Sequence, residues 1–422
     1  MDRVAGGTRS FAGTKGSLMQ DVVITGIGLR TPMGHTLDRV REVFRSGRPV
    51  VRSFEGPGGR VRAGARIDDD FTVGFTKSEL ALFDPVALIA LVASDDLIAD
   101  SGLALDSLDR ERIGVFLGTG QGALHAKDES FTSLALRDRV TGYAVLRGLD
   151  NGATNQISIR HGLRGACETT VQACSSSNIA MGNAMRAIRH GYLDVAIAGG
   201  ADAPFTEGNL RAWEAMRVMA SFDAANAQGA CRPFSKGRAG LVLGEGTVLY
   251  TFESAAHARA RGARVYARVA GYATSCDAKH ISSPDARGQA ACLAACMADA
   301  GLETRDVGYI NCHGTATPAG DPVEVASIRQ AFGSRADLTP VSATKSLHGH
   351  MLGAAGAVEL LACIVALNDG LIAPTANLDV PDEACDLDFV PIHARTGVEV
   401  DATLSTSFAF GGTNACIALV RG

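Results

Sequence analysis

The segment CETTVQACSSSNIAMGNAMRAIRHGYLDVAIAGG, residues 167–200, indicates the fold class of this chain. Its two ends, CETTVQA and DVAIAGG, have the composition of buried strands, and the stretch between them has helical spacing. Further strand-like runs occur at 21–28 and 112–120, with helix-like segments between them, and the alternation resumes after residue 255. The pattern predicts an α/β protein built from layered sheets and helices.

The overall composition is that of an ordinary globular chain, with 422 residues, 46% hydrophobic and 20% charged. A formal net charge of −5 argues against nucleic acid as a main partner, because phosphate binding needs a concentrated basic surface. No apolar run reaches the ~18 residues of a membrane span, so we expect no membrane partner. Residues 1–20 lack the apolar centre of a secretory signal and indicate a disordered leader or an expression remnant, with a transit peptide as the alternative.

The ten cysteines form no C-x-x-C pair, so a zinc site or a thioredoxin-type site has no support and we expect no metal. Most of them lie in apolar surroundings such as LLACIVAL, where cysteine acts as a small hydrophobic residue. The expected compartment is therefore the cytosol, and the protein is predicted to be cytoplasmic.

Cys174 lies where the strand-like run meets the helix, and three serines follow it. The first turn of a helix lowers the pKa of a thiol, and its free backbone N–H groups can hold an oxyanion. A buried structural cysteine beside a serine N-cap explains the segment equally well.

Two further segments carry histidines at turns. In INCHGTATPAGDPVEV (310–325), His313 ends a strand and Asp321 fits a helix N-cap, with Pro322 and Glu324 in the following turn. In SATKSLHGHMLGAAGAVEL (342–360), a lysine and two histidines crowd the turn before a helix of small residues. A polar pocket explains the second segment, and so does a solvated turn.

The last segment is STSFAFGGTNACI (405–417), in which paired phenylalanines precede Gly411 and Gly412. Glycines let backbone approach a ligand closely, although an ordinary hairpin explains this segment better when it is taken alone. A cysteine at a helix start, two histidines and a lysine are together what carbon–carbon bond formation by covalent acyl transfer requires.

The sequence resembles the Cys-His-His β-ketoacyl-acyl-carrier-protein synthases, of the elongating fatty-acid type and the bacterial type II polyketide type. The resemblance runs from about Asp21 to the C-terminus. It rests on six motifs in order: VVITGIGLRTPMG, ACSSS, CRPFSKGRAGLVLGEG, CHGTATPAGDPVE, TKSLHGHMLGAAG and SFAFGGTNA. It implies decarboxylative Claisen condensation of malonyl-ACP with a cysteine-bound acyl group.

The resemblance also implies a role for each matching residue. Cys174 would carry the acyl group, while His313 and His350 would bind the malonyl carbonyl and drive decarboxylation. Lys345 would orient this network, and Glu324 would be the acidic support near it.

Substrate contacts follow from the same motifs. The backbone N–H groups of Cys174 and Phe410 would form the oxyanion hole, and Thr315 and Thr317 would hold phosphopantetheine. No cofactor is expected on the enzyme itself, because the substrates arrive on the phosphopantetheine of an acyl carrier protein.

The resemblance has departures that bear on the acyl group. Gln172 and His348 stand where threonine is usual, and Gln121 stands at the acyl-pocket gate, where elongating synthases place an aliphatic residue. Trp213 aligns with a smaller aromatic residue of the pocket wall, to which Phe408 and Phe410 also belong. We therefore expect a pocket for short, polar or unsaturated acyl groups. A housekeeping fatty-acid elongation synthase is the alternative.

The implied fold is the thiolase fold, with two βαβαβαββ halves in five α/β/α/β/α layers. The expected halves are 21–257, with the nucleophile, and 258–422, with the two histidines. We expect a homodimer, or else a heterodimer with a chain-length-factor-like subunit. A non-catalytic factor of that kind is disfavoured because Cys174 is present. A degradative thiolase is disfavoured because Phe408 and Phe410 stand where its second cysteine would be.

Overall fold

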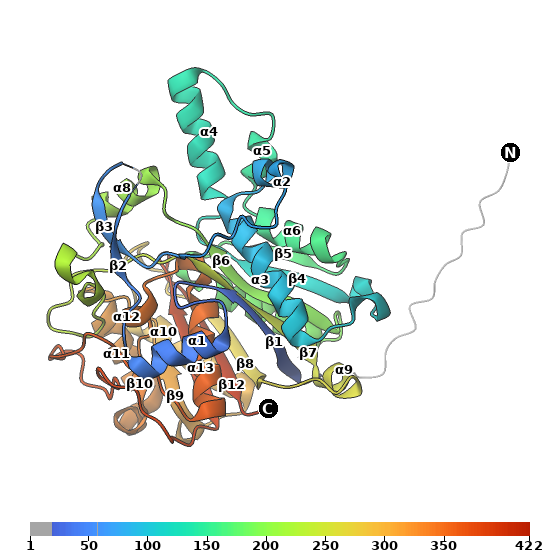
Figure 1. Ribbon diagram of the computed structural model, residues 1–422. Coiled ribbons are helices and arrows are strands. Elements are labelled where there is room, and N and C mark those ends of the chain that lie inside the picture. The colour runs from blue at the N-terminus through green and yellow to red at the C-terminus, as the bar shows by residue number, and fades with distance from the viewer. Residues whose placement is uncertain (1–18, 57) are drawn as a thin grey trace.

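The computed structural model describes residues 19–56 and 58–422, so nearly all of the predicted leader lies outside the described residues (Figure 1). Its main sheet has ten strands in the order β10-β9-β11-β12-β8-β1-β7-β6-β4-β5, and β2 pairs with β3 separately. The strands are β1 Val22–Arg30, β2 Arg52–Glu55, β3 Val61–Gly64, β4 Ile113–Gly118, β5 Cys167–Thr170, β6 Val195–Asp202, β7 Gly246–Ser254, β8 Ala267–Cys276, β9 Val307–Asn311, β10 Val341–Ser342, β11 Ala402–Phe408 and β12 Thr413–Val420.

The sheet is the sum of two equivalent five-stranded halves. In the first half, β4 runs parallel to β5 and β6, and β7 is antiparallel to β6 and β1. In the second half, β9 runs parallel to β10 and β11, and β12 is antiparallel to β11 and β8. A short antiparallel pairing of β1 with β8 joins the halves. The predicted duplication is confirmed.

The helices separate the sheet halves into layers. They are α1 Leu37–Ser46, α2 Lys77–Leu82, α3 Pro85–Ser101, α4 Leu124–Arg137, α5 Ala144–Arg147, α6 Gly152–His161, α7 Ser176–Arg189, α8 Glu207–Ala215, α9 Ala255–Ala260, α10 Ala286–Ala300, α11 Gly320–Phe332, α12 Lys345–His348 and α13 Ala355–Asp369. α7 and α13 contact strands of both halves, whereas α3 and α6 cover the first half and α10 covers the second, with α11 packed on α10. The five-layer thiolase fold is confirmed.

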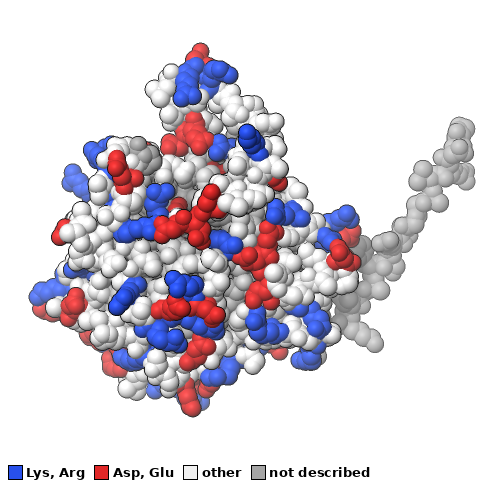
Figure 2. Space-filling model, in the orientation of Figure 1, with Lys and Arg blue, Asp and Glu red and all other residues white. Residues whose placement is uncertain are grey.

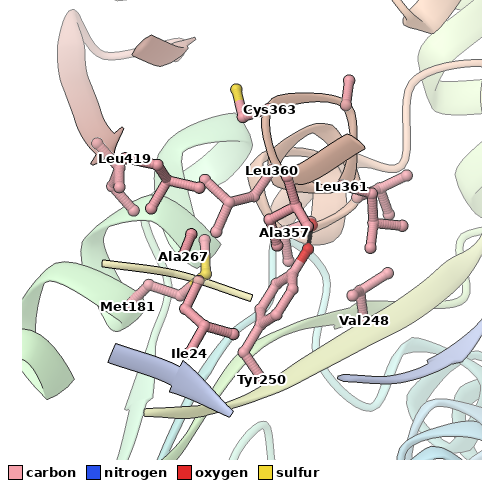
Figure 3. Close-up of a cluster of buried hydrophobic side chains, with 14 of the residues drawn as sticks. Ile24, Met181, Val248, Tyr250, Ala267, Ala357, Leu360, Leu361, Cys363 and Leu419 are labelled. Carbon is pink, nitrogen blue, oxygen red and sulfur yellow. Dashed lines mark hydrogen bonds between the residues drawn. The ribbon is translucent and has the colours of Figure 1, made fainter. Parts of the chain in front are cut away.

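The central layer is packed closely because its helices carry small residues. A Cβ on Gly182 of α7 would lie 2.4 Å from the ring of Tyr272 on β8, so only glycine permits this approach. Figure 3 shows Leu360 and Leu361 of α13 above Ile24 and Tyr250 of the strands. The Tyr250 hydroxyl donates to the Ala357 carbonyl oxygen at 2.6 Å, which satisfies the only polar atom of that side chain.

The helix at Leu352–Asp369 corrects one expectation. No apolar run long enough to cross a membrane was expected, but this helix is long and apolar enough to do so by length and hydropathy alone. However, 89% of it is buried inside the protein. It is the core helix of the central layer. All ten cysteines are free. Acidic and basic side chains are interspersed on the face seen in Figure 2.

Candidate active site

Two equivalent turns, one from each half, meet at the site. Short 3₁₀ turns at Ala173–Ser175 and Leu352–Ala354 precede α7 and α13 and contact each other. Each begins with a non-glycine residue at positive φ, Ala173 at 46° and Leu352 at 47°. Such backbone conformations persist only where the surroundings hold them, and they cluster at functional sites.

Cys174 and the two predicted histidines meet between these turns. His350 Nε2 lies 3.0 Å from Cys174 Sγ, and the rings of His313 and His350 are edge to face with centroids 5.5 Å apart. One nitrogen of each ring and the sulfur lie within 4.8 Å of one another, and all three side chains are buried. Cys174 of the first half thus meets two histidines of the second half, the farther of which follows it by 176 positions.

The hydrogen bonds fix the proton on each ring. Leu352 N–H donates to His350 Nδ1 at 3.1 Å, and the Lys345 ammonium lies 3.3 Å from His313 Nδ1. Because both partners are donors, both Nδ1 atoms are acceptors and the ring protons lie on Nε2. Two N–H donors therefore converge beside the sulfur.

This protonation does not suit a metal, although a cysteine and two histidines are plausible zinc ligands by type. A histidine that binds a metal normally donates its other ring N–H to an acceptor. Here the other nitrogens of His313 and His350 face donors instead. The donor set fits a site that holds a developing negative charge rather than a cation.

Burial sets the charge states of the cluster. It raises the pKa of the Cys174 thiol to about 12, against the opposing effect of the Lys345 ammonium. The expectation that the helix start lowers this pKa is therefore wrong, because loss of hydration on burial has the largest effect on this thiol. Burial and Lys345 also lower the pKa of His313 and of His350 well below the usual value, so both rings are neutral at physiological pH.

Lys345 is held by a carboxylate that the sequence analysis missed. Its ammonium donates to the His313 carbonyl oxygen at 2.5 Å and forms a buried ion pair with Glu359. Glu324, the expected acidic support near this network, accepts the N–H groups of His313 and Gly314 at 2.6 and 2.7 Å. Glu324 thus fixes the backbone of the histidine loop. A single acid in the apolar run GAVELLACIVAL was the signal for Glu359.

Asp321 and His348 are two further buried residues of these segments. Asp321 is not an N-cap: α11 begins at Gly320, and the Asp321 carboxylate accepts Phe234 N–H at 2.7 Å. His348 is fully buried, with its nitrogens 2.9 Å from the Gly349 carbonyl oxygen and 3.2 Å from Thr344 Oγ1. Among the described residues, its ring nitrogens bond only to Gly349 and Thr344 of the same turn.

Two cavities meet at Cys174. The histidine cavity, about 380 Å³, contains His313 and His350 and also the expected pantetheine contacts Thr315 and Thr317. The glutamine cavity, about 320 Å³, has walls that include Gln121, Asn209, Ala212 and Leu352. Three residues line both cavities besides the nucleophile, namely Trp213, Met216 and Phe410.

The boundary between the cavities is aromatic. Trp213 and Phe410 are stacked, with ring centroids 6.3 Å apart and planes at 26°. Phe408, expected in the acyl pocket, instead packs edge to face on His313 at 6.1 Å and lines only the histidine cavity. The structure therefore brings Gln121, Trp213 and Phe410 together and separates Phe408 from Gln121.

Comparison with known families agrees with this geometry. Residues 19–258 match the β-ketoacyl synthase N-terminal domain, and residues 266–379 match the C-terminal domain of the same family. The chain is 40% identical over 404 residues to nodulation protein E of a Rhizobium species (strain N33), covering 94% of this chain and 98% of that protein. It is 37% identical over 409 residues to 3-oxoacyl-[acyl-carrier-protein] synthase 2 of Synechocystis, covering 95% and 98%.

Solved structures give the same result. A type II polyketide synthase acyl-carrier protein in complex with its ketosynthase matches with a TM-score of 0.89 at 26% identity, covering 96% of this chain and all of that one. A β-ketoacyl synthase from Burkholderia phymatum matches with a TM-score of 0.88 at 29% identity and the same coverage. The fold and the cysteine–histidine cluster are those of a thiolase-fold acyltransferase. Within that class, the chain belongs to the β-ketoacyl synthase family.

Proposed function

We propose that the protein is a β-ketoacyl-acyl-carrier-protein synthase that condenses malonyl-ACP with an acyl group held on Cys174. The observation that carries the proposal is that two Nε2–H donors and one thiol meet where two cavities join. One cavity can then hold the acyl chain while the other admits the malonyl thioester. One relative is named for this activity, and one similar solved structure is named for a type II polyketide ketosynthase.

In the first step the Cys174 sulfur attacks the acyl thioester and the acyl group moves to Cys174. The thiol proton leaves with the released pantetheine sulfur, so one thioester replaces another. His350 is not the base in this step, because its Nε2 already carries a proton and its Nδ1 accepts Leu352 N–H. The acyl chain then occupies the glutamine cavity, which begins at Cys174.

In the second step malonyl-ACP loses CO₂ and becomes an enolate. The Nε2–H groups of His313 and His350 donate to the thioester oxygen, on which the negative charge develops. Lys345 keeps His313 in the donating tautomer by bonding to its Nδ1 and to its carbonyl oxygen. Glu359 pairs with the ammonium in the buried site and keeps the network near neutrality.

In the third step the enolate carbon attacks the acyl carbonyl. The oxyanion is held by the N–H groups of Cys174 and Phe410, neither of which is used in a hydrogen bond to another of the described residues. The tetrahedral intermediate expels the Cys174 sulfur and gives the β-ketoacyl thioester. Because burial raises the pKa of this thiol to about 12, the departing thiolate takes up one proton from water and the free enzyme is restored.

The glutamine cavity favours short, polar or unsaturated acyl groups. Gln121 brings an amide to its wall, and Trp213 fills volume at its boundary with the histidine cavity. A saturated chain against the amide would leave hydrogen-bonding groups unpaired, at about 1–3 kcal/mol. A polyketide or specialised fatty-acid pathway in the cytoplasm therefore suits this pocket better than housekeeping elongation.

Replacing Gln121 by Ile together with Trp213 by Phe should shift preference toward long saturated acyl groups. The expected change is about 10-fold, or about 1.4 kcal/mol, since the unpaired amide and the bulky ring are both removed. A competition assay between short and long saturated acyl-ACPs measures it. If the wild type already extends saturated chains of ten or more carbons efficiently, the proposed preference for short, polar or unsaturated acyl groups is wrong. The protein would then be a housekeeping elongation synthase.

The carrier protein would deliver both substrates through the histidine cavity. Residues of its rim, such as Ile281 and Met216, are exposed, so the cavity reaches the surface. Thr315 and Thr317 line the same cavity, and their hydroxyl oxygens are 3.1 Å apart. These hydroxyls suit the amides of a phosphopantetheine arm.

The protein would act as a homodimer through the end of the sheet at β5. β5 is the last strand of the sheet, and an exposed strand edge is a template for pairing with another strand. α4 and α5 project beyond it (Figure 1) and expose Phe131 (71%), Leu136 (78%) and Val145 (77%). A second copy paired edge to edge would cover these exposed apolar side chains.

Light scattering after size exclusion should give about twice the 43.7 kDa of one chain. Phe131→Asp combined with Val145→Asp should yield monomers, because charges would have to be buried between the copies. Tyr192→Asp, at an exposed site away from α4 and α5, is the matched control and should stay dimeric. A monomeric wild type would reject the homodimer and leave a chain-length-factor-like subunit as the partner to test.

The proposed function is tested directly by mass spectrometry of the protein incubated with a panel of acyl-ACPs and then with malonyl-ACP. We expect a mass increase on Cys174, followed by a β-ketoacyl-ACP two carbons longer and release of CO₂. Acylation without any elongated product would reject the condensation step.

A further inference from the structure

The side-chain carboxylate of Asp202, the last residue of β6, lies where the two halves of the protein meet. It is fully buried and accepts four hydrogen bonds, which occupy all the acceptor positions of a carboxylate. The donors are Thr119 Oγ1 at 3.0 Å, Gly120 N–H at 2.7 Å, Gln121 N–H at 3.0 Å and Gly353 N–H at 2.6 Å. Three come from the loop after β4, and the fourth comes from the turn before α13.

These donors belong to two parts of the site with different tasks. Gln121 forms the polar wall of the glutamine cavity. Gly353 follows Leu352, whose N–H fixes the proton position on His350 and whose φ of 47° must be held by its surroundings. The two parts touch, because a Cβ on Gly353 would lie 2.1 Å from Gly120 N. The Asp202 carboxylate therefore ties the acyl wall to the histidine turn.

We propose that Asp202 is a positioning residue that sets the donating geometry of His350 and the place of Gln121 together. The selection of the acyl group at the Gln121 wall and the decarboxylation driven by His350 are thereby coupled through the Asp202 carboxylate. This inference rests on the proposed function, because it assigns His350 to decarboxylation and the glutamine cavity to the acyl chain.

Asp202→Asn tests the proposal at constant size. Wherever its amide nitrogen lies, a donor then faces at least one backbone N–H, either that of Gln121 or those of Gly120 and Gly353. We expect kcat for condensation to fall about 10- to 100-fold with KM for malonyl-ACP unchanged, because misplaced groups lose rate rather than binding. We also expect the ratio of rates for short polar and long saturated acyl-ACPs to change in the same variant.

Gly353→Ala is the second variant. It leaves the carboxylate intact, but its Cβ would force the turn before α13 away from the loop after β4. It should reproduce both changes. Asp84→Asn is the matched control: Asp84 is another buried aspartate that accepts two backbone N–H groups, from Val86 and Ala126. It lines neither cavity, so both quantities should stay at the wild-type value.

Histidine-labelled protein gives a readout that needs no substrate. In the wild type the ring ¹⁵N shifts of His350 should report protonation on Nε2, and in Asp202→Asn they should report a mixture of tautomers. Unchanged kcat, unchanged selectivity or equal losses in Asp84→Asn would overturn the role of Asp202. A wild type that acylates but forms no condensation product would reject the proposed function instead, whatever the ¹⁵N shifts show.

Discussion

Cys174→Ala should form no acyl-enzyme and no condensation product, a loss of every measurable turnover. Cys174 is the only cysteine among the described residues that borders both cavities, so no other cysteine of this part of the chain can receive the acyl group there. Intact-protein mass spectrometry with acyl-ACP, followed by peptide mapping, measures the expected effect. Labelling of Cys312, a buried cysteine that directly precedes His313, or of any other cysteine, would reject the assignment.

Cys174→Gln separates the two halves of the reaction. The amide cannot be acylated, but it fills the space of the thiol and leaves His313, His350 and Lys345 in place. We expect malonyl decarboxylation to continue, because the Nε2–H donors act on the malonyl group and not on the sulfur. Release of CO₂ from malonyl-ACP without elongated product is the expected result. Cys276→Ala replaces an exposed cysteine that lines neither cavity, and this control variant should elongate normally.

Much of the fold could be predicted because its signals are local. Apolar runs, helical spacing and turn glycines mark the elements in 167–200 and in the closing hairpin 402–420. The duplication was predicted from the resemblance alone, since its two halves share a strand order but no periodic sequence pattern. The division at residue 257 remains a prediction, and it falls inside α9.

The site residues that belong to sequence motifs could be predicted. The properties of the site that depend on packing could not. Cys174, His313, His350 and Lys345 stand in motifs, and the structure brings them together. The partner of Lys345 was missed because Glu359 comes 14 residues later, on the far side of a turn and within an apolar helix. The raised pKa of Cys174 was missed because a helix start is visible in the sequence and the depth of burial is not.

Alanine at His313 or at His350 should lower condensation by about 10²-fold or more, the usual scale for losing an acid–base or oxyanion group. Self-acylation of Cys174 should stay measurable, because both rings are neutral and carry their protons on Nε2, so neither accepts the thiol proton. Single-turnover acylation by mass spectrometry and CO₂ release from malonyl-ACP measure the two steps separately.

The structure supplies sharper variants for the same prediction. His350→Gln places an amide N–H near the position of Nε2 and should keep more decarboxylation than His350→Ala, since the missing group is a donor and not a base. His348→Thr is the matched control, because His348 is equally buried in the same turn but lines neither cavity, and it should leave condensation near the wild-type rate. If His350→Ala and His313→Ala lost acylation as completely as condensation, the histidines would be bases for Cys174, and the tautomers derived from Leu352 N–H and Lys345 would be wrong.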